Sequence, residues 1–342
     1  MSHQAKKRKT ARHGPQEGGV QTSFKPSASF TPHPGGRDWT VSVAIPSSIL
    51  TNLATADQRV TVPGRIARAL AVFAVDEVVV FDDSPLSSRP PRTDPAAYTG
   101  DTDPCHFLAH IFSFLEAPPF MRKTLFPLHP NLRLTALLPS LDMPHHPNPK
   151  DWIHYCEGVT VTGGKSGTLV EVGLEETVEI NEKIPPKTRL TLRFSDDETQ
   201  RPECVHPSAP RTEGGYYWGY SVRKCASLSA VFTESPYDDG YDVSIGTSER
   251  GSPVSKTFSI SSSSPARLPF KHLLVVFGGP RGLEFAAMND GELTGKGVQG
   301  PRTKELFDYW VNVLPNQGSR TIRTEEAVFI ALTALRGLWD PS

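Results

Sequence analysis

Three short turns carry most of the residues in this chain that could do chemistry, and each follows an apolar, β-rich run. Residues 247–251 (TSERG) include an arginine, residues 277–284 (FGGPRGLE) include two consecutive glycines, and residues 312–324 (NVLPNQGSRTIRT) are mostly polar. Glycine at the end of a parallel strand lets backbone amide groups approach a bound molecule closely. Arginine can hold a phosphate or stabilise a negative charge that develops during a reaction. The three turns therefore predict a binding site built from backbone groups and arginine side chains.

A proton acceptor is not obvious in these turns, because none of them contains histidine or cysteine. Glu249, Glu325 and Glu326 are candidates if burial raises the pKa of one of them. The alternative is that each glutamate is solvated or stabilises the amino end of a helix, where negative charge is favoured. Arg320 and Arg323 add positive charge to the same part of the chain.

Common cofactor and metal motifs are not found in the sequence. The glycine turn is not GxGxxG and no GxxxxGK[ST] occurs, so neither a dinucleotide fingerprint nor a P-loop is indicated. Four cysteines lie far apart without a CxxC pair, which favours free thiols in a reducing compartment over a zinc site or a disulfide framework. His106 and His110 lie four residues apart on a predicted helix, but the sequence offers no third ligand. We therefore predict no metal site.

The elements that must position the turns alternate between strands and helices. Residues 39–45 and 77–81 are predicted strands, and residues 66–73 between them have the apolar spacing of a helix. A strand, a helix and a strand in this order indicate a parallel sheet. Further strands are predicted at 241–246, 272–277 and 311–314. Because the carboxyl ends of parallel strands meet at one edge, the three turns can converge on a single ligand.

A helix is predicted to close the chain, with Thr324 as its N-cap. Its apolar residues recur at the spacing that lays one helix face against a core. This predicted face consists of Ala327, Ile330, Ala331, Ala334, Leu335 and Leu338. The polar segment before the helix, residues 316–324, is longer than the roughly two to six residues of an ordinary strand-to-helix loop, which indicates a binding loop.

Residues 155–194 differ from the rest of the chain and show short alternating strands with glycine, proline and asparagine turns. The predicted strands are 157–161, 167–172, 177–180 and 189–194. This spacing favours a small antiparallel barrel of the OB type. Because the segment is rich in glutamate, an RNA-binding role would be confined to its basic residues, and a purely architectural role is the alternative. The basic residues are Lys165, Lys183, Lys187, Arg189 and Arg193.

Outside this insert, an aromatic stretch at 216–220 could stack on bases, but packing is the favoured interpretation. The amino-terminal residues 1–36 are polar and basic, and they are predicted to be disordered. Their cluster KKRK at 6–9 indicates nuclear import or nonspecific RNA contact, with a solvated tail as the alternative. The net charge of the whole chain is −1, so a nucleic-acid surface must be a local basic patch. The sequence contains no run of about 18 apolar residues that could span a membrane, and no secretory signal.

Three blocks in order, residues 245–251, 276–284 and 312–326, resemble the SPOUT class of S-adenosylmethionine-dependent RNA methyltransferases. Residues 42–48 and 142–146 are similar to the archaeal and eukaryotic branch, in which a small barrel is inserted into the catalytic domain. The resemblance covers about residues 38–338. It implies an α/β fold with an open, mostly parallel sheet and a C-terminal trefoil knot, together with an inserted antiparallel OB-like β-barrel.

The resemblance also implies a division of the chain. Residues 1–36 would form a disordered basic tail, residues 37–153 and 207–342 the methyltransferase domain, and residues 154–206 the barrel. The bound cofactor would be S-adenosylmethionine, held bent within the knot, and Ile330 or Leu332 could pack against its base. The residues expected to bind it are Thr247, Arg250, Phe277, Gly278, Gly279, Asn312, Val313, Leu314, Gly318, Ser319 and Thr321. The residues expected to act in catalysis are Arg250, Arg320 and Glu325.

The function implied is methyl transfer to ribosomal or pre-ribosomal RNA, with uridine N3 as the expected acceptor atom. The enzyme is expected in the nucleus, in the nucleolus, as a homodimer or as a heterodimer with a paralogue, joined through the C-terminal helix. A rival hypothesis is a catalytically silent SPOUT-fold ribosome-assembly factor that binds RNA without turnover, which the missing proton acceptor and the low overall basicity favour. A third class, an α/β enzyme of small-molecule metabolism, is disfavoured by the basic tail and the barrel insert.

Overall fold

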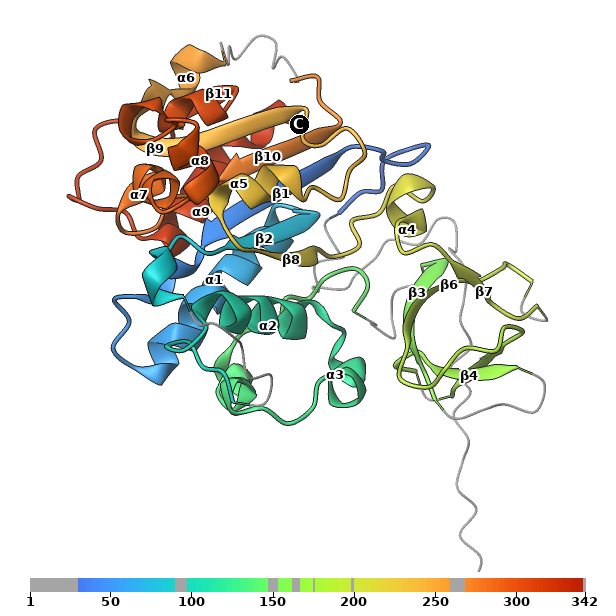
Figure 1. Cartoon of the computed structure of the whole chain (residues 1–342). Helices are drawn as coiled ribbons and strands as arrows, with labels where there is room; N and C mark the ends of the chain where they lie inside the picture. Colours follow the sequence, from blue (N-terminus) through green and yellow to red (C-terminus); the bar gives the residue numbers. More distant parts are fainter. Residues whose placement is uncertain are drawn as a thin grey trace, which may run out of the picture.

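Two β-sheets organise the chain (Figure 1). The computed structural model describes residues 30–89, 97–146, 153–161, 167–174, 176–197, 200–258 and 268–340. In these residues a six-stranded parallel sheet has the order β11-β9-β10-β1-β2-β8, and a five-stranded antiparallel sheet has the order β5-β4-β3-β6-β7. The predicted combination of a parallel sheet with a small antiparallel unit is confirmed.

The parallel sheet is the core of the larger part of the molecule. Its strands are β1 (Thr40–Pro46), β2 (Glu77–Phe81), β8 (Ser221–Cys225), β9 (Val243–Pro253), β10 (His272–Val276) and β11 (Tyr309–Asn312). The central strands β1, β2 and β10 are rich in valine, leucine and isoleucine because both faces of a parallel sheet are covered. The edge strand β8 was not predicted because its sequence, SVRKC, is mostly polar. Most of its residues are exposed or half-exposed.

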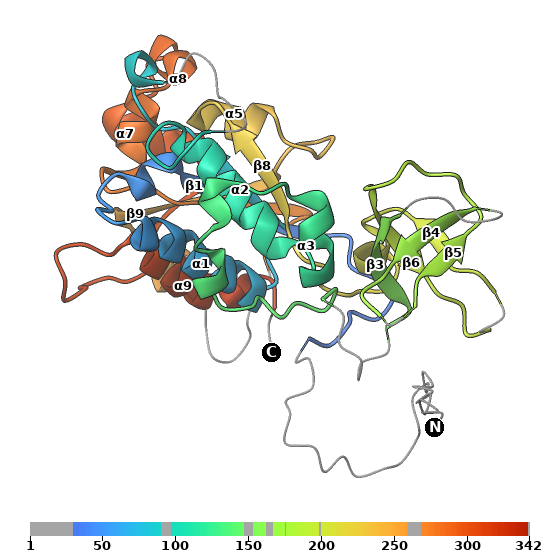
Figure 2. The same cartoon turned by 90° about the horizontal axis from the view of Figure 1, so that it is seen from below.

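Helices cover both faces of the sheet (Figures 1 and 2). One face packs against α1 (Ala56–Val72), α2 (Pro104–Glu116) and α9 (Thr324–Leu335). The other face packs against α5 (Leu228–Thr233), α7 (Gly282–Met288) and α8 (Gly291–Gly295). Three further helices are α3 (Pro119–Leu125), α4 (Ala209–Thr212) and α6 (Val254–Thr257). None of the helices in the described ranges is long and apolar enough to cross a membrane.

The phase of helix α9 was predicted only in part. Its buried face is formed by Val328, Ala331, Leu332 and Leu335, whereas Ala327, Ile330 and Ala334 are half-exposed. The helix is apolar on nearly all sides, so two faces fit the same spacing and the sequence pattern cannot choose between them. Thr324 is the first helical residue rather than the N-cap, which is Arg323. The backbone N–H of Arg323 donates to the Glu326 carboxylate at 3.0 Å.

The antiparallel sheet is a half-barrel with a small core of its own. Its strands are β3 (Tyr155–Thr160), β4 (Thr168–Glu171), β5 (Val178–Ile180), β6 (Arg189–Arg193) and β7 (Glu203–Val205). Val170, Val172, Ile180 and Leu192 are fully buried between them. In the described residues the ladder does not close, since β5 and β7 remain its two edges. The predicted antiparallel strands are confirmed, and β7 was not predicted.

A buried polar junction joins the half-barrel to the end of helix α2. Arg189 on β6 contacts the Glu116 carboxylate on α2 and the Glu157 carboxylate on β3, each with a nitrogen–oxygen distance of 2.6 Å. Glu157 also accepts a hydrogen bond from Trp218 Nε1 at 2.8 Å. His145 Nε2 lies 2.9 Å from Glu116 Oε1. Arg189 is therefore committed to the junction rather than displayed on the surface of the insert.

Arg193 and the aromatic stretch also have structural partners. Arg193 pairs with Glu203 and Glu213, both at 2.9 Å. Lys165 lies outside the described residues, so the hypothesis of RNA contact through the insert now concerns Lys183 and Lys187. In the aromatic stretch Tyr217 and Tyr220 are buried, which supports packing over base stacking. All four cysteines are free thiols, as predicted.

The junction makes the stability of the protein sensitive to mild acid. His146 belongs to the junction, since its Nε2 atom lies 2.8 Å from the backbone oxygen of Glu116. Burial, with His145 beside it, lowers the pKa of His146 to about 3 from an ordinary value of 6.5. Below pH 6.5 His146 binds a proton in the unfolded chain but stays neutral in the folded protein. The stability that neutral His146 contributes is therefore fully present above pH 6.5 and is lost as the pH falls towards 3. We expect the free energy of unfolding to fall by up to about 1.4 kcal/mol per pH unit in this window from His146 alone. Urea denaturation at several pH values between 7.5 and 4.5 measures the slope.

Two variants test the assignment of this slope. His146→Asn should flatten the pH dependence, whereas His154→Asn, at a side chain that is 47% exposed, should leave it as steep as in the wild type. Burial also lowers the pKa of His110, to about 4, so the free energy of unfolding should still depend on pH in His146→Asn, but less steeply. Equal slopes in His146→Asn and the wild type would show that His146 does not contribute.

Candidate functional site

β9, β10 and β11 are neighbouring parallel strands, and the three predicted turns lie at one edge of them. The second and third turns start at the carboxyl ends of β10 and β11, and the first interrupts β9. Hydrogen bonds join the turns to one another. Asn312 Nδ2 donates to the backbone oxygen of Glu249 at 2.8 Å, and Thr247 Oγ1 donates to the backbone oxygen of Val276 at 3.0 Å. Thr324 Oγ1 donates to the backbone oxygen of Gly278 at 3.3 Å. Segments that are far apart in the sequence therefore form one continuous edge.

A pocket of about 310 Å³ opens between the first and third turns. It is lined by Glu249, Arg250, Asn312, Leu314, Asn316 and Gln317. Arg250 reaches across the edge, since its Nη1 atom lies 3.6 Å from Glu284 Oε1 at the end of the second turn. The Arg250 side chain is 75% exposed, so its guanidinium remains accessible to an anionic ligand. The pocket lies at the lower end of the size range of small-molecule sites.

Strand β9 bulges at this pocket. Gly246 pairs with Trp310 and Ser252 pairs with the next residue, Val311, so residues 247–251 are looped out of the ladder. The strand rejoins β11 at Gly251, where an added Cβ would lie 2.3 Å from the carbonyl carbon of Val311 and 2.7 Å from the nitrogen of Asn312. Only glycine allows this approach. Residues 247–251 were predicted as a loop beyond the strand, and their return to the sheet was not predicted.

The second turn also depends on glycine. A Cβ on Gly278 would lie 2.8 Å from the backbone nitrogen of Leu283. Gly282, which follows, has φ of +78°, in the left-handed region that favours glycine. The turn at 278–282 is therefore compact and presents backbone groups rather than side chains at the edge of the sheet.

The predicted ligand-binding residues divide into three groups. Thr247, Arg250, Asn312 and Leu314 lie at the edge described above, with Gly278 and Gly279 in its second turn. Gly318, Ser319, Arg320 and Thr321 are exposed in the third turn, and the Ser319 backbone oxygen accepts a hydrogen bond from Gln317 Nε2 at 3.0 Å.

Three predicted ligand contacts belong instead to the hydrophobic core. The side chains of Phe277 and Leu332 are buried there, and Val313 packs against the same core. These side chains therefore support the edge from behind rather than line the pocket.

The candidate proton acceptors have different environments. Glu249 lines the pocket, and its backbone oxygen accepts from Asn312. Glu325 is only 6% exposed in the first turn of α9. Glu326 accepts from the Arg323 backbone N–H and so caps the helix, as the alternative interpretation predicted.

One buried carboxylate at the same edge was missed by the sequence analysis. Asp83, which follows β2, is 1% exposed and accepts from Ser48 Oγ at 2.5 Å and from the Ser48 backbone N–H at 3.0 Å. Ser47 Oγ donates to it at 3.3 Å. Burial raises the pKa of Asp83, with the hydrogen bonds from Ser48 opposing the rise. The rule that ligands lie at the carboxyl ends of parallel strands, applied to β1 and β2, would have pointed to this pair.

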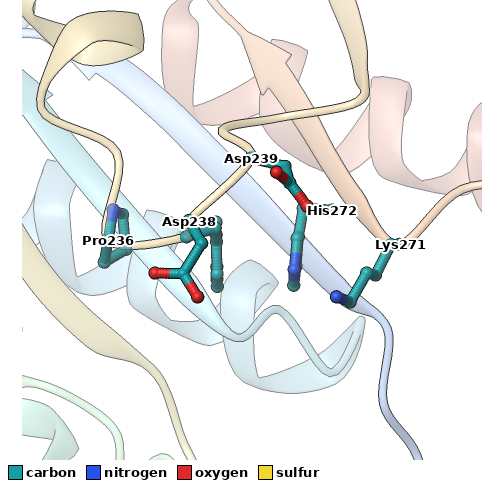
Figure 3. A pocket seen from close by; sticks show the side chains of 6 residues that line it. Pro236, Asp238, Asp239, Lys271 and His272 are labelled. Carbon is teal, nitrogen blue, oxygen red and sulfur yellow. The ribbon is translucent and has the colours of Figure 1, made fainter.

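A second pocket, of about 210 Å³, lies at the opposite edge of the sheet (Figure 3). Pro236, Tyr237, Asp238 and Asp239 form one side of it, and Lys271 and His272, at the start of β10, form the other. The rings of Tyr237 and His272 stack with their centroids 3.7 Å apart. The length of β10 separates this pocket from the glycine turn, so the two cannot share a small ligand. In the described residues no group of three or more histidine, cysteine or acidic side chains is arranged to hold a metal ion.

Comparison with known proteins identifies the family. Residues 40–335 match the family described as "Putative RNA methyltransferase". The mouse and human proteins named 28S rRNA (uridine-N(3))-methyltransferase are each 43% identical to the chain over 88% of its length, which covers 77% and 79% of those proteins. A Drosophila melanogaster protein of the same name is 41% identical over 94% of the chain and 65% of its own length. With a match over nearly all of its length, and with the strand-end turns brought to one edge, the chain belongs to this family of RNA methyltransferases.

Proposed function

We propose that this protein methylates N3 of a uridine in ribosomal RNA and uses S-adenosylmethionine as the methyl donor. The observation that carries the proposal is the 43% identity over 88% of the chain to relatives named for that reaction. The meeting of three glycine- and arginine-bearing turns at one sheet edge supports it, because ligands of open α/β sheets lie at the carboxyl ends of the strands.

The chemistry of the pocket fits such a donor. An adenosyl group needs apolar surface with a few convergent polar groups, and the pocket offers Leu314 beside the Asn312 side chain. Backbone groups of Gly278 and Gly279 would approach the ligand from the second turn. The exposed Gly318, Ser319 and Thr321 would close over it. When bound, the donor supplies an electrophilic methyl group on a positively charged sulfur, and Glu249 and Glu284 place negative charge near this edge.

The acceptor is a nitrogen that must lose its proton before or during transfer. The accessible guanidinium of Arg250 is suited to stabilise the uridine anion or to hold an RNA phosphate, and Arg320 adds a second exposed cation in the third turn. Glu325 is too enclosed to meet the RNA directly, so its proposed role is to fix the first turn of α9 behind the site.

We also propose that the fold is of the SPOUT class, with the C-terminal segment threaded as a trefoil knot around the donor site. The contact of the third turn with both other turns supports this proposal, since a threaded segment must lie against the loops that enclose it. The proposed division is residues 37–153 and 207–342 for the methyltransferase domain and 154–206 for an OB-like insert. Residues 1–29 of the proposed basic tail lie outside the described residues.

The half-exposed apolar face of α9 supports a dimer. Ile330 and Ala334 are half-exposed on this helix, whereas Ala327, one turn earlier, packs against the core of this chain. Ile330→Asp is expected to convert a dimer into monomers at micromolar concentration in sedimentation velocity. Leu137→Asp, at an exposed leucine outside this helix, should leave the dimer intact. A wild-type monomer at that concentration would overturn the homodimer and leave only pairing with a paralogue.

The proposed location is the nucleus, and within it the nucleolus, where ribosomal RNA is made. The basic cluster at 6–9 supports this address. Imaging of the tagged full-length chain, with and without alanines at 6–9, tests it. A signal that stays cytoplasmic in both forms would contradict the proposal.

Methyl transfer to unmodified 28S rRNA tests the proposed function. The purified protein, the RNA and a donor with an isotopically labelled methyl group should yield one labelled uridine, which mass spectrometry of the digested RNA identifies as 3-methyluridine. Methylation at N3 blocks base pairing, so primer extension should stop at the same nucleotide. A label on a ribose hydroxyl would reject N3 as the acceptor. Donor binding in calorimetry without any transfer would favour the silent assembly factor.

A further inference from the structure

Asp83 is a buried carboxylate at the reactive edge of the sheet with no role in the site described so far. It is 1% exposed, and no cation is within ion-pair distance of it among the described residues. The charged neighbour that acts on it is Asp82, another acid. Burying an ionised carboxylate without a cation is costly, and a buried acid of this kind at a ligand-binding edge is a candidate functional group.

Ser48 and Asp83 lie directly against the glycine turn. A Cβ on Gly279 would lie 2.1 Å from Ser48 Oγ and 3.4 Å from Asp83 Oδ2. Ser48 is half-buried, whereas Asp83 is enclosed behind it. The Ser48 hydroxyl is therefore the face that this pair presents towards the turn, and Asp83 can be reached through that hydroxyl.

The order of the strands separates the candidate donor pocket from the Ser48 hydroxyl. The sheet runs β9, β10, β1 at this edge, so the pocket beside Arg250 and the Ser48 hydroxyl lie on opposite sides of the glycine turn. Neighbouring strands are about 4.8 Å apart, so two spacings give about 10 Å. A donor held by the residues on the β9 side would have to present its methyl group across the turn towards β1. An acceptor base that enters from the β1 side would meet Ser48.

The other charged groups around Asp83 are already engaged. Arg89 lies 3.4 Å from Asp82 and donates to the backbone oxygen of Ser84. Arg281 stacks over the Phe285 ring, and Glu284 faces Arg250. Asn289 donates to the backbone oxygen of Asp83, not to its carboxylate. The Asp83 carboxylate is thus left with hydroxyl and amide donors alone.

We propose that Ser48 and Asp83 form the proton relay that removes the N3 proton of the target uridine. The proposal rests on the proposed function. The uridine proton passes to Ser48 Oγ as the serine hydroxyl proton passes to Asp83 Oδ2. The N3 electron pair then forms the bond to the methyl group, and the electron pair of the broken carbon–sulfur bond stays on sulfur. Asp83 leaves the step as a carboxylic acid and returns its proton to solvent. Ser48 is the catalytic residue, and Asp83 acts through it as a positioning residue and proton acceptor.

The first test needs no methyl donor. RNA that carries 5-fluorouridine at the target position is bound to the wild-type protein, and its ¹⁹F resonance is followed against pH. If the relay accepts the N3 proton, the bound nucleobase ionises at a lower pH than in free RNA. Asp83→Asn should remove that shift, and Ser48→Ala should do the same if the full-length Asp83→Asn protein does not fold. Asp82→Asn, a matched change at the neighbouring carboxylate, should retain it.

The second test is the pH profile of kcat/KM. Asp83→Asn and Ser48→Ala should lose about 100-fold or more at neutral pH, which is typical of removing a general base. The loss should shrink as the pH rises and the uridine ionises without help, and it should shrink at least about tenfold with the more acidic 5-fluorouridine, in line with Brønsted behaviour. A variant that is slow by the same factor at every pH and with both nucleobases would show a structural role and overturn the relay. A wild-type enzyme that transfers nothing to uridine N3 would instead reject the proposed function.

Discussion

Replacing Gly251 with alanine is expected to lower kcat/KM for methyl transfer by about 100-fold or more, although the fold is retained. The new Cβ would meet the backbone of β11 at 2.3 Å, and backbone cannot move aside as a flexible side chain can. Strand β9 must then separate from β11 at the place where Arg250 and Asn312 line the pocket. A displacement of about 1 Å in a positioning element can cost about 100-fold in rate. Single-turnover transfer to 28S rRNA and calorimetry with S-adenosylmethionine measure the effect.

A matched control separates this clash from the intrinsic effect of adding a methyl group. Gly295 in α8 has no heavy atom within 4 Å of the position that a new Cβ would take, and its φ is not positive, so Gly295→Ala should keep wild-type donor binding and rate. Circular dichroism and the urea midpoint establish whether each variant is folded. If folded Gly251→Ala binds the donor and transfers the methyl group within about twofold of the wild type, the approach of β9 to β11 does not shape the site. A tenfold change in rate would correspond to about 1.4 kcal/mol.

The layout of the sheet could be predicted from the sequence because the central strands carry the signal themselves. β1, β2 and β10 consist mostly of β-branched and apolar residues, which is what burial on both faces requires. The edge strand β8 carries no such signal. Its Arg223 is matched to buried Glu77 on β2 at 2.9 Å, a pairing that exists only after the strands are neighbours.

The parts of the site that could be predicted are those that depend on residue type. Glycines 278 and 279, Arg250 and Asn312 stand out because few residue types can fill strand-end turns at a ligand. Contacts that depend on tertiary pairing could not be predicted. The return of β9 to the sheet at Gly251 depends on β11, about 60 residues further along the chain. Asp83 looks like an ordinary surface acid in the sequence, and only its enclosure by Ser47, Ser48 and the glycine turn makes it unusual.

The junction at Arg189 shows how a sequence-based assignment can be reversed by burial. An arginine on a small barrel suggests phosphate binding, yet the glutamates that it neutralises are 9% and 3% exposed. Burial opposes ionisation of Glu116, but Arg189 and His145 outweigh this and lower its pKa to about 2. The buried charges therefore stabilise one another, and both Glu116 and Glu157 depend on the single cation of Arg189.

Removing Arg189 is consequently expected to be among the most damaging single changes in the half-barrel. Arg189→Met keeps the length of the side chain but leaves Glu116 and Glu157 without their cation, and an uncompensated buried charge costs about 3–5 kcal/mol. Arg193→Met is the matched control on the same strand. Its partners are 67% and 55% exposed, so its loss should cost about 1 kcal/mol or less. Urea denaturation followed by tryptophan fluorescence measures both, and Trp218, one of five tryptophans, donates to Glu157 within the junction.

A third variant shows whether the cost comes from stranded charge or from lost packing. Neutralising the acids in the same molecule, as Glu116→Gln with Glu157→Gln and Arg189→Met, removes the unpaired charges and should recover most of the lost stability. If the triple variant is as unstable as Arg189→Met, the arginine stabilises the junction through its packed side chain instead. If Arg189→Met costs no more than Arg193→Met, the half-barrel is not held by this ion pair. The orientation of the insert relative to the methyltransferase site would then depend on other contacts, such as the packing of Tyr155 against Tyr216 and Trp218.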